Sequence, residues 1–143
     1  MHLLARVRAL ALVAVLAPAH AADAPGFADS AACVAALKAR AAPLAERLRN
    51  GDAAAEAPLR PIVTASFAFI GTSYKQGLRK KEADEMLDQA ERKQADMPPD
   101  ELAKLQDVCQ AQGQRLFAEA NYFERLFVSR AAESRIAKLR KKA

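Results

Sequence analysis

Two adjacent prolines, Pro98 and Pro99, interrupt a chain whose apolar residues otherwise have helical spacing over most of its length. Proline cannot continue a helix but suits a first turn, so one helix should end before the pair and another should begin there. Asp100 and Glu101 fall in the new first turn, where carboxylates complement the helix dipole. Because the turn is short, we expect the two flanking helices to form an antiparallel hairpin.

The apolar spacing predicts three helices, over residues 30–49, 61–95 and 99–141. Ser30 suits the N-cap of the first helix, Pro43 should kink or break it, and Asn50-Gly51-Asp52 should end it. Residues 53–60 resemble a linker. A phase shift around residues 77–81 predicts a kink or a rotated buried face. We therefore expect an all-α fold, a small helical bundle built on a long antiparallel helical hairpin with one shorter N-terminal helix.

Folding the hairpin about residues 97–98 sets Phe67 opposite the region of Val128 and Tyr74 opposite Asn121. Seven of the chain's eight aromatic residues then fall at one end of the hairpin. Residues 79–115, at the other end, are mostly charged or amide side chains. We expect an aromatic core whose members are Val63, Phe67, Ile70, Tyr74, Leu116, Phe123 and Phe127.

Residues 1–21 resemble a secretory signal peptide. Arg6 and Arg8 precede an uncharged run over residues 9–22, and Ala19-His20-Ala21 is a small-x-small cleavage signal. The run has 14 residues, fewer than the roughly 20 that a spanning helix needs, which disfavours a membrane anchor. We expect cleavage after Ala21, a single helical domain over residues 22–143, and a periplasmic or secreted protein.

Cys33 and Cys109 are the only cysteines. An even cysteine count in an exported chain favours a disulfide between them. A free buried thiol and a lipidated Cys33 are the alternatives. Lipidation is disfavoured because a polar segment separates Cys33 from the apolar run, and Ser30 stands where a large aliphatic residue is usual.

The predicted mature chain lacks several kinds of catalytic and metal-binding residues. Both histidines, His2 and His20, lie in the leader, which removes histidine-dependent nucleophiles, metal ligands and haem ligands. There is no Cys-x-x-Cys and no glycine-rich phosphate loop. Basic residues flank the carboxylates of residues 82–91, and three i,i+4 pairs indicate a solvated, ion-paired surface: Lys80–Asp84, Lys81–Glu85 and Asp88–Arg92. We expect no enzyme activity, no cofactor and no metal.

Two further segments allow a structural and a functional interpretation. Residues 61–74 are uncharged and suit either a buried core helix or a wall of an apolar groove for a lipid or partner helix. The C-terminal cations either complement the helix dipole or contact anionic lipid or an acidic partner. The alignment leaves the last ten residues beyond the hairpin. The cations, called here the basic end, are Arg130, Arg135, Lys138, Arg140, Lys141 and Lys142.

These features predict a non-catalytic binding protein of the cell envelope. Small basic helical chaperones of the bacterial periplasm are similar in leader, size and composition, although no motif is shared. The first hypothesis is a protein-interaction module, such as a chaperone, an inhibitor or an assembly subunit, with an unidentified protein partner. The alternative is an envelope-surface or apolar-ligand binder that contacts an anionic membrane. Export disfavours nucleic acid as a partner.

Overall fold

The computed structural model describes residues 24–142, and the described chain folds into helices joined by short turns. The predicted all-α fold is confirmed. The predicted signal peptide lies outside the described residues. In chain order the elements are α1 (Phe27–Arg49), the short 3-10 helix η1 (Ala53–Ala55), α2 (Glu56–Lys75), α3 (Lys80–Ala95), α4 (Pro99–Glu119) and α5 (Tyr122–Arg140).

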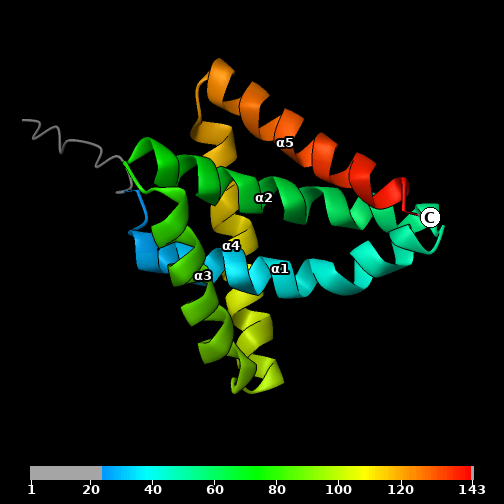
Figure 1. Ribbon diagram of the computed structural model, residues 1–143, viewed down its shortest axis with the longest axis horizontal. Helices are drawn as coiled ribbons and strands as arrows, with labels where there is room; N and C mark the ends of the chain where they lie inside the picture. Colours follow the sequence, from blue (N-terminus) through cyan, green and yellow to red (C-terminus); the bar gives the residue numbers. More distant parts are fainter. Residues whose placement is uncertain (1–23, 143) are drawn as a thin grey trace, which may run out of the picture.

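The helices are arranged around the antiparallel pair α1 and α2 (Figure 1). Helix α5 runs antiparallel along the other side of α2, and α4 crosses both α1 and α2. Helix α3 packs against α1, where the Gln94 amide donates a 2.8 Å hydrogen bond to the carbonyl of Ala32. Helices α3 and α4 contact each other little, so each is held mainly by its contacts with other helices.

Glycines end two of the helices. Gly51 follows α1 with φ +90°, and Gly77 follows α2 with φ +102°. This left-handed region is costly for residues with a Cβ. The stop predicted at Asn50-Gly51 is therefore confirmed, whereas the phase shift near Gly77 marks a complete break between helices rather than a kink.

Three details near the helix ends differ from the sequence prediction. Helix α1 begins at Phe27 with Gly26 as its N-cap, so Ser30 lies inside the helix and is buried. Pro43 does not break α1, which is continuous through it. Residues 53–60 are not a linker, because α2 already begins at Glu56. Pro58 falls in the first turn of α2, where its missing N–H removes no helical hydrogen bond.

The two long helices of the expected hairpin are each divided. The segment 61–95 separates into α2 and α3 at Gly77, and the segment 99–141 separates into α4 and α5 at Ala120. Ala120 is extended, with ψ 150°, and Asn121 caps the next helix. Of the expected hairpin, the antiparallel pairing of α2 with α5 is present, since Lys75 pairs with Glu124 and Arg60 with Glu133.

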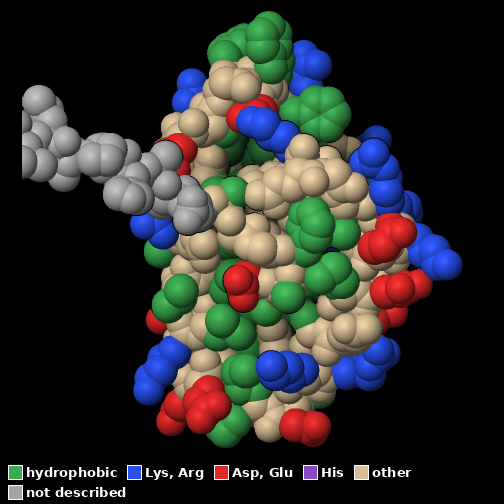
Figure 2. Space-filling view, turned by 90° about the vertical axis from the view of Figure 1, so that its left-hand side faces the viewer, with side chains coloured by type: hydrophobic (Ala, Val, Ile, Leu, Met, Phe, Trp, Pro, Cys, Tyr) green, Lys and Arg blue, Asp and Glu red, His purple; other side chains and the backbone are tan. Residues whose placement is uncertain are grey.

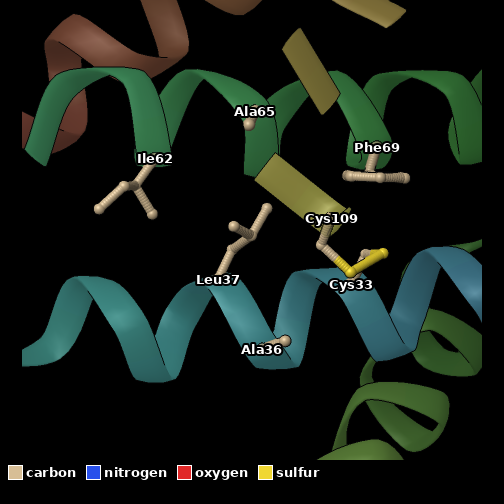
Figure 3. Packing of buried hydrophobic residues seen from close by; sticks show 7 residues of the cluster. All are labelled: Cys33, Ala36, Leu37, Ile62, Ala65, Phe69 and Cys109. Atoms are coloured by element: carbon tan, nitrogen blue, oxygen red, sulfur yellow. A yellow bond between two sulfur atoms is a disulfide. The ribbon is translucent and has the colours of Figure 1, made fainter. Parts of the chain in front are cut away.

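One hydrophobic cluster surrounds the disulfide where α1, α2 and α4 meet (Figure 3). We call it the disulfide cluster. Gly113 of α4 crosses directly over Ala65 of α2, and a Cβ at position 113 would lie 2.7 Å from the Ala65 Cβ. Only glycine allows this close a crossing. The cluster comprises Cys33, Ala36, Leu37, Ile62, Ala65, Phe69 and Cys109.

A second cluster, the C-terminal cluster, joins the end of α1, η1, the start of α2 and the second half of α5. Ile136 is fully buried in it and Leu139 is nearly so. The prediction that the last ten residues extend beyond the hairpin is therefore wrong for α5, which packs almost to its end because α2 begins earlier than expected. The cluster comprises Leu48, Ala55, Leu59, Val63, Ala132, Ile136 and Leu139.

The aromatic core predicted from the sequence is only partly present. Val63 is buried, while Phe67, Ile70 and Leu116 are half-buried. Phe69, not among the predicted core residues, is the largest fully buried side chain. Three assignments are wrong: the exposed fractions are 44% for Tyr74, 78% for Phe123 and 81% for Phe127. Phe123 and Phe127 are exposed because the break at Ala120 lets α5 turn its other side to α2, and Tyr74 lies in the last turn of α2, next to the break at Gly77.

Candidate functional site

The first turns of α5 display three aromatic side chains on the surface, and we call them the aromatic corner: Tyr122, Phe123 and Phe127. Tyr122 is 66% exposed, and its ring meets that of Phe123 edge to face with centroids 5.6 Å apart. Phe123 and Phe127 are one helical turn apart and point away from Val128, which is buried towards α2. Figure 2 shows apolar side chains at the end of the molecule where α4 meets α5, with Lys and Arg beside them.

A capping box fixes the start of α5. The Asn121 side chain accepts a hydrogen bond from the Glu124 N–H, and the Glu124 carboxylate accepts one from the Asn121 N–H, both at 3.0 Å. Glu124 also pairs with Lys75 of α2. The hydrogen bond from Lys75 and the one from the Asn121 backbone lower the pKa of Glu124. The aromatic corner is therefore carried on a capped helix end rather than on a loop.

Tyr122 was not among the predicted core or binding residues. Its neighbour Arg125 has helical spacing with the buried Val128 and Ala132 and so lies on the inner side of α5. Arg125 donates a 3.2 Å hydrogen bond to the carbonyl of Ala118 and leaves the rest of its guanidinium exposed. The spacing Asn121-x-x-Glu124 is a capping-box signature and could have indicated a new helix at Tyr122.

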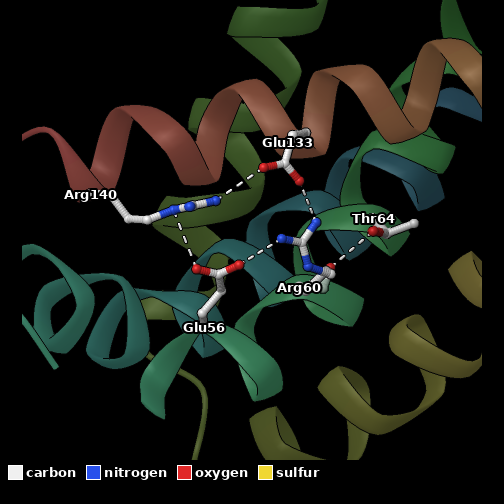
Figure 4. Close-up of polar contacts among 5 residues, drawn as sticks. All are labelled: Glu56, Arg60, Thr64, Glu133 and Arg140. Carbon is white, nitrogen blue, oxygen red and sulfur yellow. Dashed lines mark hydrogen bonds and ion pairs between the residues drawn. The ribbon is translucent and has the colours of Figure 1, made fainter. Parts of the chain in front are cut away.

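The basic end divides into a held part and a free part. The Arg140 guanidinium lies 3.3 Å from Glu56 and 3.0 Å from Glu133, and Arg60 bridges the same two carboxylates at 2.6 Å each (Figure 4). The hydrogen bond from Arg60 is the main cause that lowers the pKa of Glu133. The remaining members, Arg130, Arg135, Lys138, Lys141 and Lys142, are exposed and form no ion pair with another described residue.

The charge around α5 is strongly asymmetric. Residues 115–142 contain eight Lys or Arg and three Glu. Two of those carboxylates, Glu124 and Glu133, are paired with cations of α2. Only Glu119, at the end of α4, is exposed without an ion pair among the described residues. The solvent side of α5 is therefore positive.

The predicted disulfide between Cys33 and Cys109 is confirmed, with the two Cα atoms 5.1 Å apart. Cys109 is fully buried and Cys33 is 6% exposed, so the pair lies in the core. The alternatives of a free thiol and a lipidated Cys33 do not agree with this bond. The cysteines join α1 to α4 and contribute structure rather than a reactive group.

The acidic residues of α3 form a solvated surface, as the sequence indicated. Of the three predicted i,i+4 pairs, Lys80–Asp84 is formed, and Glu91, which belongs to none of them, pairs with Lys38 of α1. The hydrogen bond that Lys80 donates to the Asp84 carboxylate is the main cause that raises the pKa of Lys80. In the described part of the chain, no group of three or more His, Cys, Asp or Glu side chains could hold a metal ion.

Two clefts lie away from α5. A cleft of about 110 Å³ between α1, α2 and α3 is mostly apolar, and the buried Ser30 hydroxyl in its wall has no hydrogen-bond partner. It is far smaller than the roughly 300 Å³ at which small-molecule sites begin. A groove of about 450 Å³ runs beside the disulfide, with Val108, 62% exposed, in its wall. Neither includes a residue of α5.

The uncharged stretch 61–74 is mainly a core helix. Ile62, Ala65 and Phe69 pack in the disulfide cluster, and Val63 packs in the C-terminal cluster. Its last turn contributes Ile70, together with Ser73 and Tyr74, to the small cleft. None of the helices in residues 24–142 is long and apolar enough to cross a membrane.

No family model matches the chain, and neither a curated protein nor a solved structure matches it significantly. The exposed surfaces are therefore the features from which a function can be inferred.

Proposed function

We propose that the protein is an exported, non-catalytic binding module that attaches to its target through the outward side of α5. The observation that carries this proposal is the exposure of the aromatic corner. Phe123 and Phe127 do not contribute to either hydrophobic cluster. Contiguous exposed apolar side chains are typical of interaction surfaces.

The basic end supports the same surface. Arg130 and Lys138 follow Phe123 and Phe127 along the helix, and both are exposed without an ion pair among the described residues. A target that covers both groups must offer apolar surface and negative charge together. Export is supported by the leader-like N-terminus and by a disulfide, which is compatible with an oxidising compartment.

Fractionation tests this function without assuming the nature of the target. The protein is produced with its leader in a bacterial host, and the soluble periplasmic fraction is separated from the envelope. We expect the wild type in the envelope fraction and the double variant Phe123→Ser/Phe127→Ser in the soluble fraction. Both side chains are exposed, so melting should change little.

The matched control is Val108→Ser, which removes an exposed apolar side chain from α4 on a different surface. It should fractionate like the wild type. If the wild type and the double variant fractionate alike, the outward side of α5 is not a docking surface and the proposed function is wrong.

A further inference from the structure

We infer that the target of α5 is an anionic lipid surface, an inference that depends on the proposed function. Helix α5 has 19 residues and is about 28 Å long. It forms one edge of the molecule, with α2 on its inner side (Figure 1). A flat surface can therefore contact α5 along its length without meeting α3 or the turn between α3 and α4.

The side chains on this edge suit the boundary between headgroups and acyl chains. Aromatic rings enter that boundary with their apolar bodies, and Lys and Arg reach from it towards phosphate. Phe123 and Phe127 supply the rings, and Arg130 and Lys138 lie on the same outward side. The carboxylates of α5, Glu124 and Glu133, are engaged by cations of α2, so they do not oppose an anionic surface.

A second copy of this chain is a less suitable occupant. A two-fold contact brings the same surface patch of each copy together. Here it would bring the cations Arg130 and Lys138 of the two copies together, with no carboxylate on the outward side to neutralise them.

An acidic protein is less suitable for a different reason. Protein hot spots are typically paired with pockets in which anchors are enclosed. Phe123 and Phe127 project from α5, and neither of the two clefts includes a residue of this helix, so a protein partner would itself have to provide the pocket that encloses the rings. A deformable lipid boundary accommodates such rings without a preformed recess.

Tryptophan fluorescence tests the inference, because the chain contains no Trp. Phe123→Trp places a single reporter in the aromatic corner, and Val108→Trp places one on α4 as a control. Each oxidised protein is titrated with vesicles of phosphatidylcholine alone and with vesicles of equal parts phosphatidylcholine and phosphatidylglycerol. We expect a blue shift for Phe123→Trp with the anionic vesicles, at least about tenfold weaker binding to the neutral ones, and no shift for Val108→Trp.

Charge variants test the role of the cations by vesicle co-flotation. Arg130→Ser/Lys138→Ser should bind anionic vesicles roughly thirtyfold more weakly, from the usual contribution of two basic side chains at an anionic surface. Arg92→Ser/Lys104→Ser removes two exposed cations from α3 and α4 and should bind like the wild type. Added salt should weaken binding of the wild type because it screens exposed charges.

The inference is overturned if Phe123→Trp gives no shift with anionic vesicles, if both vesicle types bind equally, or if the two charge variants lose the same affinity. Envelope association that still depends on Phe123 and Phe127, combined with no vesicle binding, would identify a protein target and retain the proposed function. Loss of that dependence would remove both.

Discussion

The first half of α5, residues 122–130, exposes its largest side chains, whereas the second half, residues 131–140, buries smaller ones. Phe123 and Phe127 lie in solvent, while Ala132, Ile136 and Leu139 fill the C-terminal cluster. The second half lies where the end of α1, η1 and the start of α2 converge. The first half mainly has α2 beside it. Val128, in the first half, is buried as well, so burial in this helix follows the side that faces α2 and its neighbours rather than the size of the apolar side chain.

The two halves are also held differently by charge. The first half has the capping box and the Lys75–Glu124 pair. The second half has the network of Glu56, Arg60, Glu133 and Arg140 in addition to its buried residues. Exposed pairs of this kind contribute little to stability, so the buried residues should decide which half is stable.

Removal of the disulfide tests whether the two halves of α5 depend on one cooperative core. The bond joins residues 76 positions apart. A loop of that size gives a stabilisation of up to about 4 kcal/mol in chain-entropy models. Cys33→Ser/Cys109→Ser should lose much of that free energy of unfolding in urea titration. Both halves of α5 should lose amide-exchange protection together, and a loss confined to one half would show that they unfold independently.

Truncation at one site in each half should give the sharpest contrast. Ile136→Ala creates a cavity at a fully buried site and should cost roughly 2 to 5 kcal/mol. Phe123→Ala removes a larger side chain from an exposed site and should cost under about 0.5 kcal/mol. Chemical denaturation of the two single variants measures both values. Equal losses would contradict the comparison.

Two substitutions in the basic end should differ less in their effect on the free energy of unfolding. Arg140→Ser removes the ion pair with Glu56 and should cost less than about 1 kcal/mol. Lys138→Ser, at an exposed site without an ion pair among the described residues, should cost under about 0.5 kcal/mol. Thermal melting at low and high salt checks the ranking, and salt should reduce the Arg140 effect. A larger loss from Lys138→Ser would mean that this side chain has a structural contact.

Acid should produce the smallest and most local effect. The folded pKa of Glu124 lies below its ordinary value of 4.5, because Lys75 and the Asn121 N–H stabilise the carboxylate. The stabilisation is therefore present above that ordinary value and is lost as pH falls through the lowered one. We expect the start of α5 to fray in acid before its buried second half, as faster amide exchange. In Glu124→Gln, amide exchange at the start of α5 should depend less on pH. An unchanged pH dependence would mean that another titrating group causes it.

Much of the fold could be predicted because local signals determine it. Asn50-Gly51 and Pro98-Pro99 end helices for backbone reasons that hold in any context. The pairing of Cys33 with Cys109 followed from an even count in a chain with a leader-like start. An antiparallel arrangement was expected from the short Pro98-Pro99 turn, and α2 does lie antiparallel to α5, although both predicted long helices are divided.

The position of the aromatic corner could not be predicted in the same way. A continuous helix from Pro99 to Lys141 would have kept Phe123 and Phe127 on one stripe with Leu116. The break at Ala120 rotates α5 relative to α4, so the three residues no longer share one stripe. The sequence around Ala120 contains no proline or glycine that would predict this break. The capping box at Asn121 and Glu124 was the available signal. The close crossing of Gly113 over Ala65, which directs α4 across α2, depends on contacts between distant segments and has no local signature.

The disulfide also determines how the protein responds to proteolysis. It closes the chain between Cys33 and Cys109, and α5 begins after that closed segment, at Tyr122. A protease that cuts once inside the segment leaves two fragments joined through sulfur. One cut at Ala120 or Asn121, beside the exposed aromatic rings, separates α5 from the other helices. The bond that secures those helices therefore gives no covalent protection to the helix that we propose makes contact with the target.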